Sequence, residues 1–142
     1  MPGLDFRKRF AQAVKDGTKL QTIRKRRTPP IKTGDHLTLW TGQRTKQCQP
    51  LGDATCTNVL PVKIITERTE IWLWDEETQF MDADFEITGN FYVLSQDKAE
   101  AFAKADGFGN LEEFFAFFKN YQPDVRHFEL VVIFWRKGWD FK

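Results

Sequence analysis

The segment 16-DGTKLQTIRKRRTPPIKTGDHLTLWTGQRTK-46 combines a concentration of basic residues with clear turn and strand signals. Residues 1–46 contain 12 Lys and Arg but only 3 Asp and Glu, which gives them a net charge of +9. The whole chain of 142 residues has a formal net charge of only +1, because the remainder is acidic. This asymmetry predicts that an anionic partner binds the N-terminal part of the protein.

Two strands and an intervening loop are predicted within this segment. Residues 20–26 (LQTIRKR) favour a strand because Thr22 and Ile23 are β-branched. Residues 28–35 (TPPIKTGD) contain two prolines and a Gly-Asp pair, which predict a loop. In residues 36–41 (HLTLWT) leucines alternate with other side chains, as is typical of a strand with two different faces. The basic residues are therefore expected on strand ends and loops.

The rest of the chain predicts further strands and three helices. Extended segments are predicted at 56–75, 85–94 and 126–137, and helices at 6–15, 97–106 and 110–121. Asp5 is expected to cap the first helix and Gly17 to end it. Pro61 predicts a sheet edge or a bulge, because proline lacks the N–H that a ladder needs. This order predicts an α+β fold, a single domain over residues 1–142 built on a small sheet or barrel.

Composition excludes several classes of protein. Hydrophobic residues make up 41% of the chain and aromatic residues 15%, which is enough for one core and too much for a disordered chain. The longest strongly apolar run, residues 130–135, is too short to span a bilayer. No signal peptide is visible at the N-terminus. The sequence therefore predicts a soluble, cytoplasmic protein.

A metal site is not expected. Cys48, Cys56, His36 and His127 are the cysteines and histidines of the chain, and their spacing matches no usual zinc pattern. In a reducing compartment the two cysteines are expected to be free thiols or packing residues. No phosphate loop, dinucleotide fingerprint or nucleophile elbow is present, so no cofactor is predicted.

Two motifs together resemble a known family. The first is Gly17-x-Lys19-x-x-Thr22-x-Arg24, followed after a basic loop by Gly34-Asp35 and an aliphatic strand; the second is the segment 105-ADGFGNLEEFFAFFKNY-121. In this order they resemble the ASCH domain family of the PUA-like superfamily. The resemblance implies a small β-barrel with flanking helices and a cleft beside the barrel. It also implies RNA as a partner, because the family is associated with RNA binding.

The resemblance implies catalytic residues as well. Some bacterial members of the family remove the acetyl group from N4-acetylcytidine with a Lys, a Thr and a Glu, and others are reported as ribonucleases. Lys19 and Thr22 match the first two by position. The acid falls nearest Asp106, one methylene shorter than Glu, with Glu112 or Glu113 as alternatives. Chemically, a buried Lys can act as a base and a Thr hydroxyl as a nucleophile when a base is near. A surface lysine and a strand-forming threonine would explain the same two residues.

The basic residues are candidates for phosphate contacts, since Arg binds phosphate through paired hydrogen bonds. The tryptophans are expected mainly in the core, and Trp40 is the candidate for base stacking because it lies nearest the basic stretch. The predicted nucleic-acid-binding residues are Arg24, Lys25, Arg26, Arg27, Trp40, Arg44 and Lys46. A solvated charge run is the alternative. The sequence thus predicts RNA or modified-nucleoside binding, with deacetylation of an N4-acetylcytidine-type base or RNA cleavage as alternatives.

Overall fold

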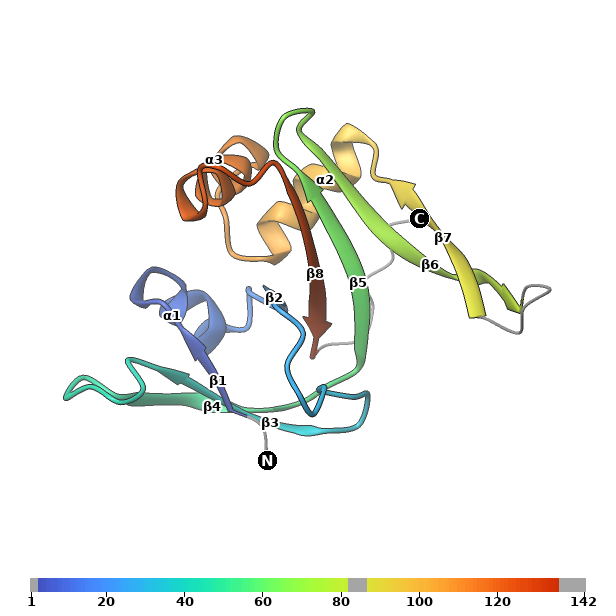
Figure 1. The fold of residues 1–142 in the computed structure, drawn as a ribbon. Helices are drawn as coiled ribbons and strands as arrows, with labels where there is room; N and C mark the ends of the chain where they lie inside the picture. The colour runs from blue at the N-terminus through green and yellow to red at the C-terminus, as the bar shows by residue number, and fades with distance from the viewer. Residues whose placement is uncertain (1–2, 82–86, 136–142) are drawn as a thin grey trace.

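The computed structural model describes residues 3–81 and 87–135 (Figure 1). The described elements are β1 (Gly3–Phe6), α1 (Lys8–Asp16), β2 (Gln21–Arg24), β3 (His36–Thr41), β4 (Gln49–Thr55), β5 (Asn58–Ile65), β6 (Glu70–Met81), β7 (Ile87–Val93), α2 (Gln96–Ala105), α3 (Leu111–Tyr121) and β8 (His127–Phe134). The predicted α+β class is therefore confirmed.

The described strands form two sheets. The smaller sheet has the order β1-β3-β4, with β1 parallel to β3 and β4 antiparallel to it. The larger sheet has the order β2-β8-β5-β6-β7 and is antiparallel throughout. Within the described residues no ladder joins the two sheets, so the strands do not close into a barrel. Strand β8 lies between β2 and β5 and so connects the basic N-terminal segment to the centre of the larger sheet.

Most predicted elements are present with shifted ends. The extended segment 56–75 divides into β5 and β6, and Pro61 pairs with Val131 of β8 just before the β5–β6 ladder begins at Val62. Pro61 therefore has a hydrogen-bonded strand on one side only, as its missing N–H requires. Four residues of the predicted strands, at 85–86 and 136–137, lie outside the described residues.

Three details of the sequence-based prediction are wrong: the cap of the first helix, strand β4, and strand β1, which was not predicted and takes Phe6 from the predicted first helix. Asp5 does not cap the first helix: it lies in β1, and the cap position is Arg7, which makes no side-chain cap hydrogen bond. Strand β4 was not predicted, because its sequence, QPLGDAT, contains Pro and Gly and has little β-propensity. Its pairing with β3 supplies what the local sequence lacks. Gly17 does end α1, in the left-handed conformation with φ of 80°.

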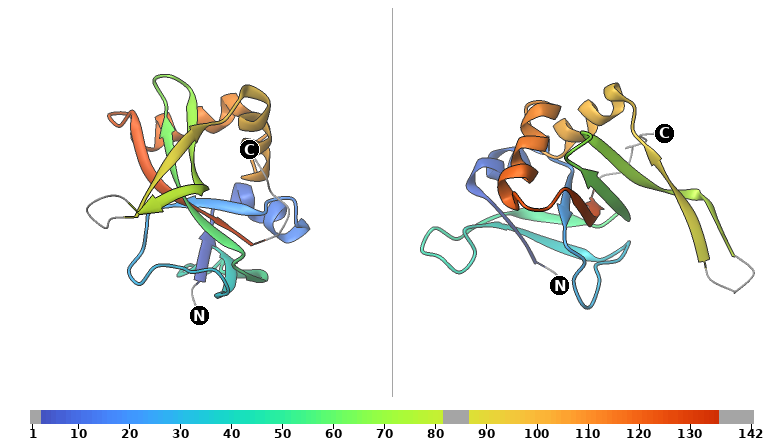
Figure 2. Two further views of the ribbon diagram at one scale, coloured as in Figure 1. Left: turned by 90° about the vertical axis from the view of Figure 1, so that its right-hand side faces the viewer. Right: turned by 45° about the horizontal axis from the view of Figure 1, so that its top comes forward.

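The helices gather on one side of the larger sheet (Figure 2). Their contact surface is rich in phenylalanine, and the Phe114 ring, fully buried, lies 5.0–6.2 Å from the rings of Phe102, Phe108, Phe115 and Phe118. Asn110 fixes the start of α3, since its side chain accepts a hydrogen bond from the Glu113 N–H at 2.8 Å. This packing holds the C-terminal end of α2 and one face of α3 against β2 and β8.

Replacing Phe114 with Ala should lower the free energy of unfolding by about 3–5 kcal/mol, because it leaves a cavity among packed rings. Tyr121→Ala, at a side chain that is 45% exposed, should lower it by about 1 kcal/mol. Urea denaturation of both variants measures the difference. Equal losses would contradict the assignment of Phe114 to the centre of the core.

Candidate functional site: a cleft above a buried Lys–Asp pair

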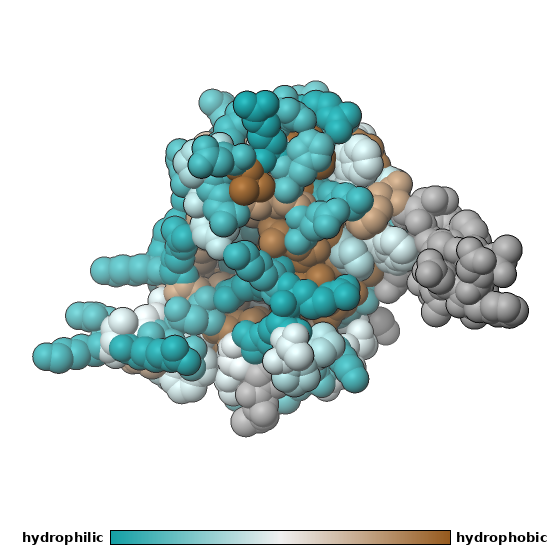
Figure 3. Space-filling model, in the orientation of Figure 1, coloured by the Kyte–Doolittle hydropathy of each residue, from teal (hydrophilic) through white to brown (hydrophobic). Residues whose placement is uncertain are grey.

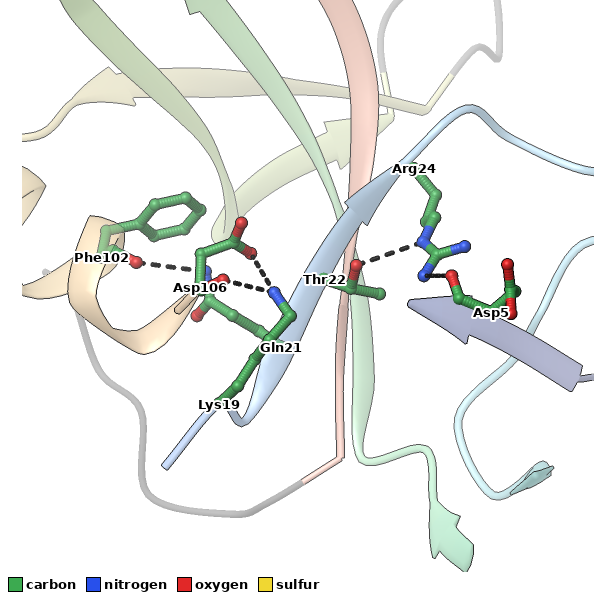
Figure 4. Close-up of polar contacts among 7 residues, drawn as sticks. All are labelled: Asp5, Lys19, Gln21, Thr22, Arg24, Phe102 and Asp106. Carbon is green, nitrogen blue, oxygen red and sulfur yellow. Dashed lines mark hydrogen bonds and ion pairs between the residues drawn. The ribbon is translucent and has the colours of Figure 1, made fainter. Parts of the chain in front are cut away.

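A lysine and an aspartate 87 positions apart in the chain meet inside the protein. The Lys19 ammonium donates to the main-chain oxygen of Asp106, and its Nζ lies 3.6 Å from Asp106 Oδ1 (Figure 4). Lys19 is 2% exposed and Asp106 is 5% exposed. Asp106 thus contacts Lys19 although its side chain is a methylene shorter than the Glu of the family pattern. The backbone of α2 brings it close enough.

Two glycines make this meeting geometrically feasible. Gly17 turns the chain at the end of α1, so that Lys19, two residues before β2, lies beside the end of α2. There the Leu20 N–H donates to the Ala105 oxygen at 3.2 Å. Gly107, with φ of 98°, follows Asp106, and a Cβ at this position would lie 3.1 Å from the Lys19 side chain. The Gly-x-Lys and Asp-Gly pairs of the sequence therefore have a steric explanation.

Aromatic rings and an amide complete the surroundings of the pair. Lys19 Nζ lies 4.9 Å from the ring centroid of Phe10 and 5.7 Å from that of Phe6, a favourable arrangement for a cation. Gln21 is fully buried and its amide donates to the Phe102 oxygen at 3.5 Å. Among the described residues, Asp106 Oδ1 and Gln21 Oε1 find no hydrogen-bond donor. Of the two residues, Asp106 lines the cleft, so its Oδ1 is a buried acceptor that a ligand can satisfy.

Burial moves the two pKa values toward each other. Desolvation lowers the pKa of Lys19 to about 8, against the opposing effect of the Asp106 charge. Desolvation likewise raises the pKa of Asp106 to about 6, while the Lys19 charge acts in the opposite direction. Each group can therefore exchange a proton within roughly one to two pH units of neutrality, which is the range that acid–base chemistry needs.

A cleft of about 260 Å³ opens above the pair. Its floor contains Lys19, Thr22 and Asp106, and one wall is formed by α3. On this wall the rings of Phe117 and Tyr121 are nearly parallel, at 3°, with centroids 6.3 Å apart. Tyr121 is 45% exposed, so this aromatic wall is open to a ligand. Sequence analysis missed it, although residues four apart on a helix share a face.

Thr22 is tied to the first residue of the basic run. Its hydroxyl oxygen accepts from Arg24 Nε at 3.2 Å, which leaves the hydroxyl hydrogen for another acceptor. Arg24 Nη2 donates to the main-chain oxygen of Asp5 at 2.6 Å, and the guanidinium lies 4.9 Å from the Phe6 ring centroid. Arg24 is therefore a fixed part of the cleft wall rather than a solvated charge.

The other predicted residues divide into three groups. Lys25 lines the cleft together with Arg24, whereas Arg26 and Arg27 are exposed and line a neighbouring cavity. Trp40, Arg44 and Lys46 do not line the cleft: Trp40 is half-buried in β3, and the two basic residues are exposed between β3 and β4.

The alternative acids lie outside the cleft. Glu112 is exposed on α3, and Glu113 accepts from the Gly109 N–H at 2.9 Å. Asp106 is therefore the acid that faces Lys19.

Within residues 3–81 and 87–135, no cluster of three His, Cys, Asp or Glu side chains is suited to a metal ion. Of the cysteines, Cys48 is exposed and Cys56 is buried, and both are free thiols. None of the described helices is long and apolar enough to cross a membrane.

Comparison of the chain with protein-family models, with curated proteins and with solved structures found no match. The resemblance to the ASCH family therefore remains a prediction from the two motifs.

Asp106→Asn should move the pKa of Lys19 further below about 8. The substitution removes the negative charge that favours the ammonium and leaves the desolvation of Lys19 in place. An NMR titration of the Lys19 ε-methylene measures the shift. Glu112→Gln, which removes an equal charge at the exposed alternative acid, should leave the pKa of Lys19 unchanged. The same pKa in wild type and Asp106→Asn would contradict the pairing.

Proposed function

We propose that the cleft binds a base of RNA or of a modified nucleoside, with the adjoining phosphate held by Arg24 and Lys25. The observation that carries this proposal is the composition of the cleft: a buried Lys19–Asp106 pair below, an aromatic wall beside it and two cations at its edge. These are the three kinds of contact that single-stranded RNA recognition uses.

The size and polarity of the cleft favour a single base. A volume of about 260 Å³ lies just below the roughly 300–1,000 Å³ of pockets for drug-sized ligands. The sugar and phosphate would therefore stay at the rim, beside Arg24 and Lys25. The floor offers donors from Lys19 and Thr22 and an acceptor from Asp106, which suits the mixed donor and acceptor edge of a base.

The relation to PUA-like proteins is part of the same proposal. The helices lie on one side of the two sheets (Figure 1). The cleft lies beside the larger sheet, between α1 and α3. This arrangement is compatible with an opened small barrel. The match of Lys19 and Thr22 to the family motif, with Asp106 nearest to the position of the family's Glu, supports the location of the site, since all three line one cleft.

Loss of the aromatic wall should weaken RNA binding. We expect Tyr121→Ala to reduce the affinity for a labelled single-stranded RNA heptamer roughly 10-fold, because it removes one stacking surface. Tyr121→Phe keeps the ring and should bind nearly as tightly as wild type. Fluorescence anisotropy measures both variants. Equal binding by wild type and Tyr121→Ala would contradict stacking on this wall.

Phosphate contacts should appear in the salt dependence of the same assay. Lys25→Ala should reduce the slope of log affinity against log salt by about 0.7, the value for one contact to a single strand. Lys104→Ala removes an equal charge from an exposed position of α2 that does not line the cleft, and should leave the slope unchanged. A denaturing gel of the recovered RNA also tests for ribonuclease activity, and intact RNA would contradict that alternative.

Amide hydrolysis is a second candidate, supported by the pKa of Lys19, lowered to about 8, in the cleft that Thr22 also lines. Neutral Lys19 would accept the Thr22 proton as the hydroxyl oxygen attacks the acyl carbon. The C–N bond would then break, and the departing nitrogen would take the proton back from Lys19. Water would hydrolyse the acyl-threonine ester to complete the turnover.

N4-acetylcytidine is the test substrate for this second candidate, with cytidine measured by chromatography. Turnover should rise as pH approaches about 8, since only the neutral amine of Lys19 accepts a proton. Lys19→Arg and Thr22→Val should both abolish it, because Arg keeps its proton and Val has no hydroxyl. Glu112→Gln should leave it unchanged. Turnover that survives Lys19→Arg would rule the mechanism out and leave binding as the function.

A further inference from the structure

A second cavity lies directly beside the cleft. It has a volume of about 570 Å³ and is bounded by residues 24–32 on one side and by Leu4 of β1 and residues of β5 and β8 on the other. Arg24 and Lys25 line both this cavity and the cleft, so the two hollows meet at these residues. Figure 3 shows the molecule in the orientation of Figure 1. Apolar surface lies at the centre of the visible face, surrounded by hydrophilic side chains.

The second cavity combines an apolar floor with a cationic rim. Its floor contains Ile31, Val59, Val131 and Ile133, and its rim contains Lys25, Arg26, Arg27 and Lys32. None of the described residues that line it is acidic. A small hydrated anion would gain nothing from the apolar floor, and an uncharged apolar ligand would gain nothing from the rim. A nucleotide matches both parts, because its base has apolar faces and its backbone is anionic.

We propose that this cavity receives the base next to the one in the cleft, so that the ligand is a single RNA strand of at least two nucleotides. This inference rests on the proposed function and adds the substrate class: an oligonucleotide rather than a free nucleoside. The phosphate between the two nucleotides lies at Arg24 and Lys25, where the hollows meet.

The geometry also selects the form of the RNA. Two bases that enter separate hollows, on either side of the same pair of residues, cannot stack on each other or pair with a second strand. Splayed bases of this kind belong to single strands and loops. Arg24 is well suited to the position between them, since its contacts with Thr22 and Asp5 fix the guanidinium in place. An arginine has five N–H donors, so donors remain for the phosphate after these two contacts are made.

The experiment compares dinucleoside monophosphates with matched analogues in which one ribose has no base. Both ligands carry one phosphate, so the comparison isolates the second base. By isothermal titration calorimetry, the best complete dinucleotide should bind roughly 10-fold more tightly than its analogue. Free nucleosides are titrated in parallel, because they report on the cleft alone.

Two variants locate the gain in affinity. Val59→Phe partly fills the second cavity from a half-buried position and should bring the complete dinucleotide down to the affinity of its analogue, without changing nucleoside binding. Lys32→Ala removes an exposed charge of the rim and should weaken the dinucleotide several-fold. Lys104→Ala is the control for charge and should have no effect. Thermal denaturation of each variant verifies folding, and Lys32, being exposed, keeps the test valid if Val59→Phe unfolds.

Each outcome is decisive. If the analogue binds as tightly as the complete dinucleotide, or if Lys32→Ala does not change the affinity, the proposal of a second subsite is wrong. The cleft would still be supported in that case if wild-type protein binds a nucleoside and Tyr121→Ala does not. If no nucleoside, dinucleotide or heptamer binds wild-type protein, the proposed function fails and the subsite fails with it.

Discussion

The buried contact between Lys19 and Asp106 is the interaction on which the site depends. Removing two charges from water costs several kcal/mol for each, and only close pairing with additional hydrogen bonds offsets this. Here the ammonium has the carboxylate, the main-chain oxygen of Asp106 and two aromatic rings as neighbours. Because the contact joins the segment just before β2 to the end of α2, it holds α2 beside the cleft. The same contact therefore positions α2 in the fold and supplies the ionisable groups on the floor of the cleft.

Basic residues of the N-terminal segment lie near this pair in the folded protein. Arg24 points inward and is held by Thr22 and Asp5, whereas Lys25 and the two following arginines are exposed along two adjoining hollows. The consecutive basic residues therefore do different things, although in sequence they look alike. A nearly neutral protein can in this way present a cationic surface on one side, while acidic residues elsewhere keep the total charge small.

The aromatic residues connect stability with recognition. Rings from α2 and α3 pack around Phe114, and the same helix α3 carries Phe117 and Tyr121 at the edge of this cluster. Phe117 also contacts the rings of Phe108 and Phe118, so the aromatic wall of the cleft is supported directly by the core. A wall supported in this way is pre-organised, which reduces the entropy lost when a ligand binds.

Local sequence was sufficient for the α+β class and for most strands and helices, because turn residues and periodicity are short-range signals, whereas the family resemblance supplied Lys19, Thr22 and Asp106 as candidates. It was not sufficient for β4, whose Pro and Gly give no strand signal until β3 pairs with it. Nor did it favour Tyr121 over Trp40, and the preference for Asp106 over Glu112 came from the family resemblance alone. Those choices depend on which side chains face one cavity, and only the packing of α2 and α3 against β2 and β8 decides that, since it joins residues far apart in the chain.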